Sequence, residues 1–307
     1  MQGPGTIEPD VSREIRSTTV AVIGAGRVAT ALAVRLEGAG YRVVAITGRE
    51  ATRERGRRFL PHAAFLPLEA AQEGTRDADL VVVGVPDDLI AEVCGRLAGQ
   101  RAFAAGQRVV HLSGSLGLDA LGAAREVGAM VLSLHPLQSF PSVEVGVARL
   151  SGSPIAVTAL DERGCIFGEK LARDAGGVPF RIADEVKPLY HAAAVFCSNY
   201  LVAVEAIAER LFRLAGLAEP APTFHPLARA AFESTFASGP GSALTGPAAR
   251  GDAGTIARNL AALQEHAPEA IPAYVALARV AAGLAAGSGN LSPEGEARVE
   301  EVLRRWT

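Results

Sequence analysis

The sequence predicts a doubly wound α/β domain followed by an all-α domain. Short runs of β-branched residues alternate with helical patterns in the first half of the chain, which is typical of βαβ units. From Asp184 to the end no convincing strand occurs. The length of 307 residues fits about two domains. We therefore expect a loose tail at 1–16, an α/β domain at 17–183 and a helical domain at 184–307.

The expected elements follow from hydrophobic periodicity and from turn residues. Gly216 closes the first helix of the second domain, Asp252 caps the third, and Ser292 opens the last. Strands are expected at 18–23, 42–47, 63–66, 79–85, 107–112, 129–134, 154–158 and 178–182. Helices are expected at 27–39, 51–60, 68–74, 87–98, 161–175, 185–215, 223–237, 253–266, 269–286 and 292–304.

The composition indicates a globular cytoplasmic protein, with 49% hydrophobic and 21% charged residues. A net charge of −3 argues against nucleic acid or an anionic membrane as the main partner. The three cysteines are scattered, as expected in a reducing compartment. Residues 1–16 lack the apolar core of a signal peptide, and no run of 18 apolar residues predicts a membrane span.

A glycine motif directly after the first expected strand predicts a dinucleotide site of the Rossmann type. The segment reads Gly24-Ala-Gly26-Arg-Val-Ala29, and a helical run follows it. The first glycine allows the tight turn, the second lets the backbone approach the pyrophosphate, and the small Ala29 lets the helix pack on the sheet. A glycine-rich turn without a ligand is the alternative. The expected cofactor contacts of this loop are Gly24, Gly26, Arg27, Val28 and Ala29.

The end of the second expected strand favours NADP(H) over NAD(H). An NAD enzyme usually carries an acidic residue there for the ribose 2′-hydroxyl, whereas this chain reads Thr47-Gly48-Arg49. A guanidinium suits a 2′-phosphate because it makes paired, charge-assisted hydrogen bonds. The neighbouring Glu50 argues against this interpretation, and a solvated helix face is the alternative. We expect Thr47 and Arg49 to contact the cofactor.

Ligands of doubly wound sheets lie beyond the carboxyl ends of the strands. Val85 and Pro86 follow one such end and are expected to flank the cofactor, whereas Asp87 either faces the site or caps the next helix. Ser113 and His135 follow two further strand ends and are candidate substrate contacts. His111 is expected to be a hydrogen-bonded strand histidine. The histidine spacing matches no metal-binding motif, so no metal is expected.

Two regions of the second domain add candidate residues. Lys187 and His191 share one helix face with small residues, and a lysine and a histidine could move a proton to a reducing carbonyl or imine. Asn199 on the flank could bind the substrate. Arg250 lies next to glycine and beside an expected helix N-terminus, which suits an anion. The alternatives are a surface lysine, a core histidine and a solvent-exposed arginine.

Six segments together resemble an uncharacterised bacterial family that joins a Rossmann-like domain to a C-terminal domain of unknown function. This family is similar to the NADP-dependent oxidoreductases around pyrroline-5-carboxylate reductase and the β-hydroxyacid dehydrogenases. The segments are V-I-G-A-G-R-V-A (22–29), H-L-S-G-S (111–115), L-H-P-L-Q-S-F (134–140), K-P-L-Y-H-A-A-A (187–194), S-N-Y (198–200) and L-T-G-P-A-A-R-G-D (244–252).

The resemblance implies the architecture of 6-phosphogluconate dehydrogenase and a homodimer formed through the helical domain. Lys187 matches the catalytic lysine of β-hydroxyacid dehydrogenases, but His191 stands where those enzymes carry Asn. We therefore expect an NADP(H)-dependent oxidoreductase acting on a small, anionic carbonyl, hydroxyl or imine substrate, with Lys187 and His191 as the catalytic pair. The alternatives are a non-catalytic NADP(H)-binding sensor or scaffold and an F420-dependent NADP oxidoreductase.

Overall fold

The computed structural model describes residues 18–306, which form two compact units. The first unit ends at Ser198 and the second begins at Asn199. The expected tail at 1–16 lies outside the described residues. The first unit includes helix α9 (Lys187–Val195), so the residues just after Asp184 are packed with the sheet domain.

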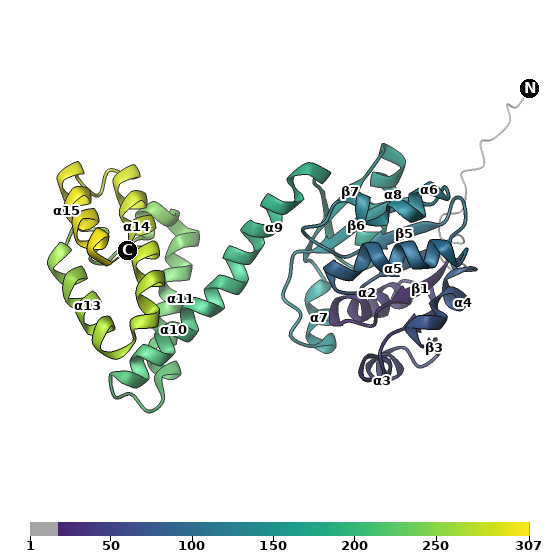
Figure 1. Cartoon of the computed structure of the whole chain (residues 1–307), viewed down its shortest axis with the longest axis horizontal. Helices are drawn as coiled ribbons and strands as arrows, with labels where there is room; N and C mark the ends of the chain where they lie inside the picture. Colours follow the sequence, from purple (N-terminus) through teal and green to yellow (C-terminus); the bar gives the residue numbers. More distant parts are fainter. Residues whose placement is uncertain (1–17, 307) are drawn as a thin grey trace, which may run out of the picture. The chain divides into compact units, whose positions relative to one another are not determined.

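The first unit contains one sheet of eight strands in the order β3-β2-β1-β4-β5-β6-β7-β8. Figure 1 shows this sheet domain in purple to teal. Neighbouring strands from β3 to β6 pair in parallel, β7 runs antiparallel to β6, and β8 runs parallel to β7. All eight expected strands are present. They are β1 (Thr19–Ile23), β2 (Arg42–Thr47), β3 (Ala64–Leu66), β4 (Leu80–Val83), β5 (Arg108–His111), β6 (Met130–Pro136), β7 (Pro154–Ala159) and β8 (Val178–Arg181).

Helices cover both faces of this sheet, because successive strand residues point to opposite faces. Val20 and Val22 of β1 join one core, and Ala21 and Ile23 join the other. The first core includes side chains of α2, α7 and α8, and the second includes those of α4, α5 and α6. The helices are α2 (Arg27–Gly38), α3 (Glu50–Phe59), α4 (Ala71–Thr75), α5 (Asp87–Gly99), α6 (Gly122–Glu126), α7 (Val143–Leu150) and α8 (Glu162–Asp174).

The second unit is helical throughout its described residues. The Asp252 carboxylate accepts a hydrogen bond from Thr255 N at 3.0 Å, and Ser292 Oγ accepts one from Gly295 N at 3.2 Å, so both expected caps are confirmed. The helices are α10 (Leu201–Leu214), α11 (Pro220–Ser238), α12 (Pro240–Ala243), α13 (Ala253–His266), α14 (Ile271–Gly287) and α15 (Pro293–Leu303).

The helix expected at 185–215 is subdivided. It begins as a 3₁₀ turn, η3 (Asp184–Val186), continues as α9, and passes through a π-helical turn, η4 (Phe196–Tyr200), into α10. Two helical segments have the length and mean hydropathy of a membrane span, namely Asp184–Leu214 and Pro268–Gly287. The second contributes Val275 and Ala282 to the core of its unit, which accounts for its apolar character.

Candidate functional site

The glycine loop lies at the switch point of the sheet, where β1 is flanked by β2 and β4. Gly24 has a φ of +89°, and a Cβ there would come within 2.8 Å of Val85 Cγ1 and 2.9 Å of Val85 N. Only glycine therefore fits this turn. Gly26 is the N-cap residue of α2 and provides no side-chain cap, so the first N–H groups of α2 can face an anion.

The helix that follows the loop packs closely on the end of β4. Ala29 is buried, and a Cβ on Gly84 would come within 2.3 Å of Ala29 Cβ. The pair thus allows α2 to approach the strand, as the motif predicted for Ala29. Gly84 was not singled out from the sequence, although it directly follows an apolar strand. Arg27 is exposed and Val28 is half-buried at the start of α2.

The end of β2 presents a basic surface. Thr47 is buried, and its carbonyl accepts hydrogen bonds from Gly24 N at 3.1 Å and Ala25 N at 3.0 Å. Arg49 is the exposed N-cap residue of α3. The carboxylate of Glu50 pairs with Arg53 and lies 3.8 Å from Arg57. The acid that argued against NADP(H) is therefore engaged by other residues of its own helix.

The loop after β5 is tied to the N-terminus of α5. Asp87 Oδ2 accepts hydrogen bonds from Ser113 Oγ at 2.6 Å and Ser115 Oγ at 3.1 Å. Asp87 does not cap α5, whose N-cap residue is Pro86. Ser113 is buried and its hydroxyl is engaged by Asp87, whereas Val85 is half-buried and Pro86 is exposed.

His111 is a strand histidine, as expected. It is fully buried, and its Nδ1 accepts a hydrogen bond from Ser113 N at 3.2 Å. Burial, followed by the nearby charge of Lys187, lowers its pKa to about 4. The ring is therefore neutral at physiological pH and supports the loop after β5.

Three side chains, His135, Tyr190 and His191, form what we call the histidine cluster. His135 Nδ1 lies 2.7 Å from Tyr190 Oη, and the two imidazoles have ring centroids 5.9 Å apart. A Cβ on Gly114 would come within 2.8 Å of His135 Nε2 and 2.7 Å of His191 Cδ2. Gly114 therefore lets the loop after β5 lie against both rings. All three cluster side chains are half-buried, so the cluster is reachable from solvent.

The protonation states in the cluster are set mainly by burial. Burial, the Lys187 charge and then His191 lower the pKa of His135 to about 4, so its ring is neutral at pH 7. Burial raises the pKa of Tyr190 to about 12, so the phenol keeps its proton. Tyr190 was not predicted from the sequence, although it directly precedes His191.

Lys187 lies beneath this surface. Its side chain is 0% exposed, and its Nζ donates hydrogen bonds to Ser113 O at 3.0 Å and Ser133 Oγ at 2.8 Å. Burial lowers its pKa to about 8. The preceding Asp184 accepts a hydrogen bond from Leu118 N at 3.0 Å, which anchors the start of α9 to the loop after β5.

The remaining two candidates, Asn199 and Arg250, belong to the second unit. Both are exposed. Arg250 follows a turn at Gly246, with a φ of +104°, and precedes Gly251, with a φ of +69°. Neither residue is among those that the first unit brings together. Among residues 18–306, no three His, Cys, Asp or Glu side chains are arranged to hold a metal ion.

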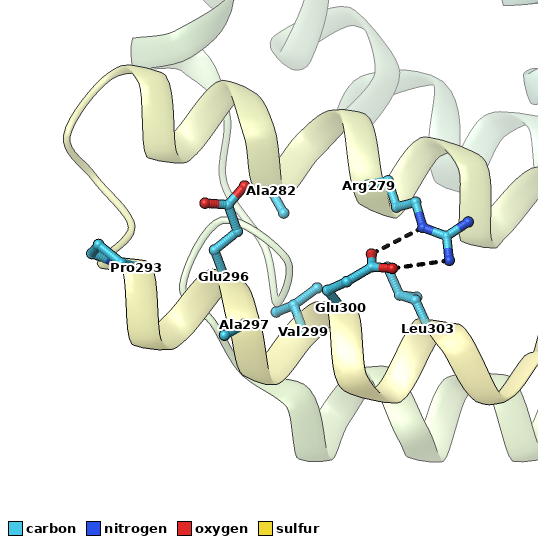
Figure 2. A pocket seen from close by; sticks show the side chains of 8 residues that line it. All are labelled: Arg279, Ala282, Pro293, Glu296, Ala297, Val299, Glu300 and Leu303. Atoms are coloured by element: carbon cyan, nitrogen blue, oxygen red, sulfur yellow. Dashed lines mark hydrogen bonds and ion pairs between the residues drawn. The ribbon is translucent and has the colours of Figure 1, made fainter.

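A separate cavity of about 390 Å³ lies between α14 and α15 of the second unit (Figure 2). Arg279 and Glu300 face each other across it. Arg279 Nε lies 3.0 Å from Glu300 Oε2, and Nη2 lies 3.3 Å from Oε1. This paired geometry satisfies the charges of Arg279 and Glu300 within the protein, and Glu296 is a further carboxylate in the lining.

Comparisons with solved structures confirm the fold. A "putative NADP oxidoreductase" from Bacteroides fragilis is 24% identical, with a TM-score of 0.75 over 88% of this chain and 99% of its own. Protein TM1727 from Thermotoga maritima is 23% identical, with a TM-score of 0.65 over 88% and 99%. A 1-pyrroline-5-carboxylate reductase from Streptococcus pyogenes is 19% identical, with a TM-score of 0.52 over 72% and 79%. No curated protein matches the sequence.

Two family models match separate parts of the chain. The model of the Rossmann-like domain matches residues 5–136, and that of the domain of unknown function DUF2520 matches residues 153–281. The second match begins just before β7, so it includes the last two strands of the sheet and most of the helices that follow, and residues 137–152 lie between the two matches. The chain thus joins a Rossmann-like domain to a DUF2520 domain.

Proposed function

We propose that this protein is an NADP(H)-dependent oxidoreductase that acts on a small, anionic carbonyl, hydroxyl or imine substrate. The observation that carries the proposal is a shared sheet edge. The glycine loop, with its turn that only glycine fits, and the histidine cluster both lie where parallel strands of one sheet end. Cofactor and substrate sites of doubly wound sheets occupy this edge.

The described residues fit a dinucleotide. A side chain at Gly24 would collide with Val85, and one at Gly84 would collide with Ala29. The N-terminus of α2 has no side-chain cap, which suits the pyrophosphate. Arg49, the exposed N-cap residue of α3, offers a guanidinium for a 2′-phosphate, which supports the choice of NADP(H). A bound nicotinamide would supply or accept the hydride. The structure from Bacteroides fragilis is described as a "putative NADP oxidoreductase", which is in line with this choice.

The histidine cluster can bind and protonate a carbonyl oxygen or an imine nitrogen. The Tyr190 hydroxyl keeps its proton and can donate a hydrogen bond to His135 Nδ1, and in that arrangement the proton of the neutral ring lies on Nε2. Nε2 is the atom close to Gly114, and it can donate a hydrogen bond to a substrate atom. His191 is the cluster histidine that belongs to α9. We assign to it the role of the acid that gives its proton to the substrate.

A metabolite screen tests this function. The purified protein is incubated with NADPH and small keto acids, semialdehydes or cyclic imines, and oxidation is followed by nicotinamide absorbance. We expect turnover with at least one substrate class, and we expect it to fall in His191→Phe without loss of NADPH binding. NADPH binding without turnover of any class would favour the non-catalytic sensor, and turnover only with deazaflavin would favour the F420 alternative.

We further propose that the protein is a homodimer formed through the second unit. Large apolar side chains are exposed along α10, α11 and α14, and α10 and α11 line a groove of about 770 Å³. An apolar surface of this kind marks a contact site. Glu205 and Arg229 both line the groove and offer opposite charges to a second copy.

A further inference from the structure

Lys187 makes a closed set of hydrogen bonds away from solvent. Its Nζ donates to Ser113 O and Ser133 Oγ, and Ser133 Oγ itself donates to Ser113 O at 3.2 Å. The lysine comes from α9, whereas its partners come from the loop after β5 and from β6. The ammonium therefore joins β6 and α9, which carry the histidine cluster, to the loop after β5, which lies against it.

Histidines lie near this ammonium, and two carboxylates act on it from outside its hydrogen-bonding partners. The positive charge of Lys187 contributes to the lowered pKa of His111 on β5 and of His135 on β6. His191, which belongs to α9, lies beside His135. Asp87 on α5 and Asp184 in η3 act on the ammonium from outside its hydrogen-bonding partners. Because those partners are an uncharged carbonyl and an uncharged hydroxyl, the positive charge is not cancelled locally.

Position 187 carries a lysine in a chain whose basic residues are nearly all arginine. The chain has 30 basic residues, and only Lys170 and Lys187 are lysines. An arginine presents five donors in a wide planar fork and does not lose its charge, whereas lysine is a compact donor of three protons. The space between Ser113 O and Ser133 Oγ is filled by one nitrogen that donates to both.

We infer that Lys187 is a positioning residue of the proposed site, which fastens the Ser113–Ser115 loop to β6 and holds its positive charge near His135. This inference rests on the proposed function, because His135 matters only if the cluster binds a substrate. It is an alternative to direct proton transfer by Lys187, whose side chain is fully buried. The neutral His135 can then donate from Nε2 without carrying a charge of its own.

Histidine and lysine NMR on the full chain tests the inference without cofactor or substrate. With [ε-¹³C]lysine the protein gives two lysine signals, and Lys170→Met assigns them. With [ε1-¹³C]histidine, His135→Gln assigns the His135 signal. We expect the titration midpoint of Lys187 near pH 8 and that of His135 near pH 4. In Lys187→Met the His135 midpoint should rise by about one pH unit.

The control is Lys170→Met, because Lys170 pairs with Asp174 on α8 and has no contact with the cluster. It should leave the His135 midpoint unchanged. An unchanged His135 midpoint in folded Lys187→Met would overturn the inference. If that variant does not fold, a wild-type Lys187 midpoint near the ordinary value of about 10.4 would overturn it instead. Both results are independent of NADPH binding, which tests the proposed function separately.

Discussion

His111 and His135 show how position along neighbouring strands separates two similar side chains. Burial lowers the pKa of each ring to about 4. His111 lies inside the sheet and holds the backbone of Ser113, whereas His135 lies one strand further along and remains half-buried beside Gly114. Both are neutral at pH 7, but only His135 can reach a ligand.

The two lowered pKa values predict acid sensitivity. The unfolded chain takes up protons below pH 6.5, whereas the folded protein does so only near pH 4. The free energy of unfolding should therefore fall as the pH drops from 6.5 to 4, by about 3 kcal/mol for each histidine. Urea unfolding over this pH range measures the slope. His111→Gln should flatten it and the exposed control His62→Gln should not; equal slopes would refute the assignment.

Gly114→Ala should damage the histidine cluster without affecting the cofactor loop. The new Cβ would lie within 2.8 Å of both imidazoles, so at least one ring must shift. We expect turnover of a substrate found in the screen to fall roughly 10- to 100-fold, with NADPH binding retained. Gly95→Ala is the control, because a Cβ there meets no atom within 4 Å. Full activity of Gly114→Ala would mean that the cluster does not contact the substrate.

Residue types and spacing could suggest the site but could not assign roles within it. The i, i+4 spacing of Lys187 and His191 correctly predicts a shared helix face. It does not show that one side chain is buried and the other half-exposed, since this depends on Ser113 from the loop after β5 and on Ser133 from β6. The catalytic roles of Lys187 and His191 remain predictions.

At the scale of elements, the glycine loop and α3 were predictable because their signals are local. The turn requires glycine, and the end of β2 carries arginine where an acid is common. Helices α6 and α7 were missed because five and eight residues are too few for a clear period. The direction of β7 was also not predictable, since a strand pattern carries no information on direction.

Arg49→Ala tests the choice of cofactor. The loss of a charge-assisted contact to the 2′-phosphate should weaken NADPH binding roughly 10- to 100-fold and leave NADH binding unchanged. Fluorescence titration with both nucleotides measures the ratio. Arg42→Ala is the control, because Arg42 is exposed at the opposite end of β2. Equal weakening for both nucleotides would place Arg49 outside the 2′-phosphate site.

At the scale of the whole molecule, the proposed dimer rests on the exposed apolar side chains of the second unit. Leu227 and Phe236 of α11 are 70% and 77% exposed. We expect the wild type to sediment as a dimer, and Leu227→Glu or Phe236→Glu to sediment as a monomer. Ile166→Glu is the control, since Ile166 is also exposed but lies on α8 of the first unit. A monomeric wild type that binds lipid vesicles would contradict the dimer.

The fold as a whole was predictable because alternating strands and helices, and then helices alone, give hydrophobic patterns that extend over most of the sequence. The site was less predictable because its parts come from four strand ends and one helix. The shared edge brings together the glycine loop, Asp87, the loop after β5 and His135. The contacts of the loop after β5 and of His135 with α9 become visible only in three dimensions.

Titration of the purified protein with NADPH and NADH, followed by nicotinamide fluorescence, tests the central claim most directly. Saturable binding of one NADPH per chain, tighter than that of NADH and abolished in Gly24→Ala, is the result that the proposed site predicts. Binding of neither nucleotide by the folded wild type would contradict the claim that this sheet edge holds a nicotinamide cofactor.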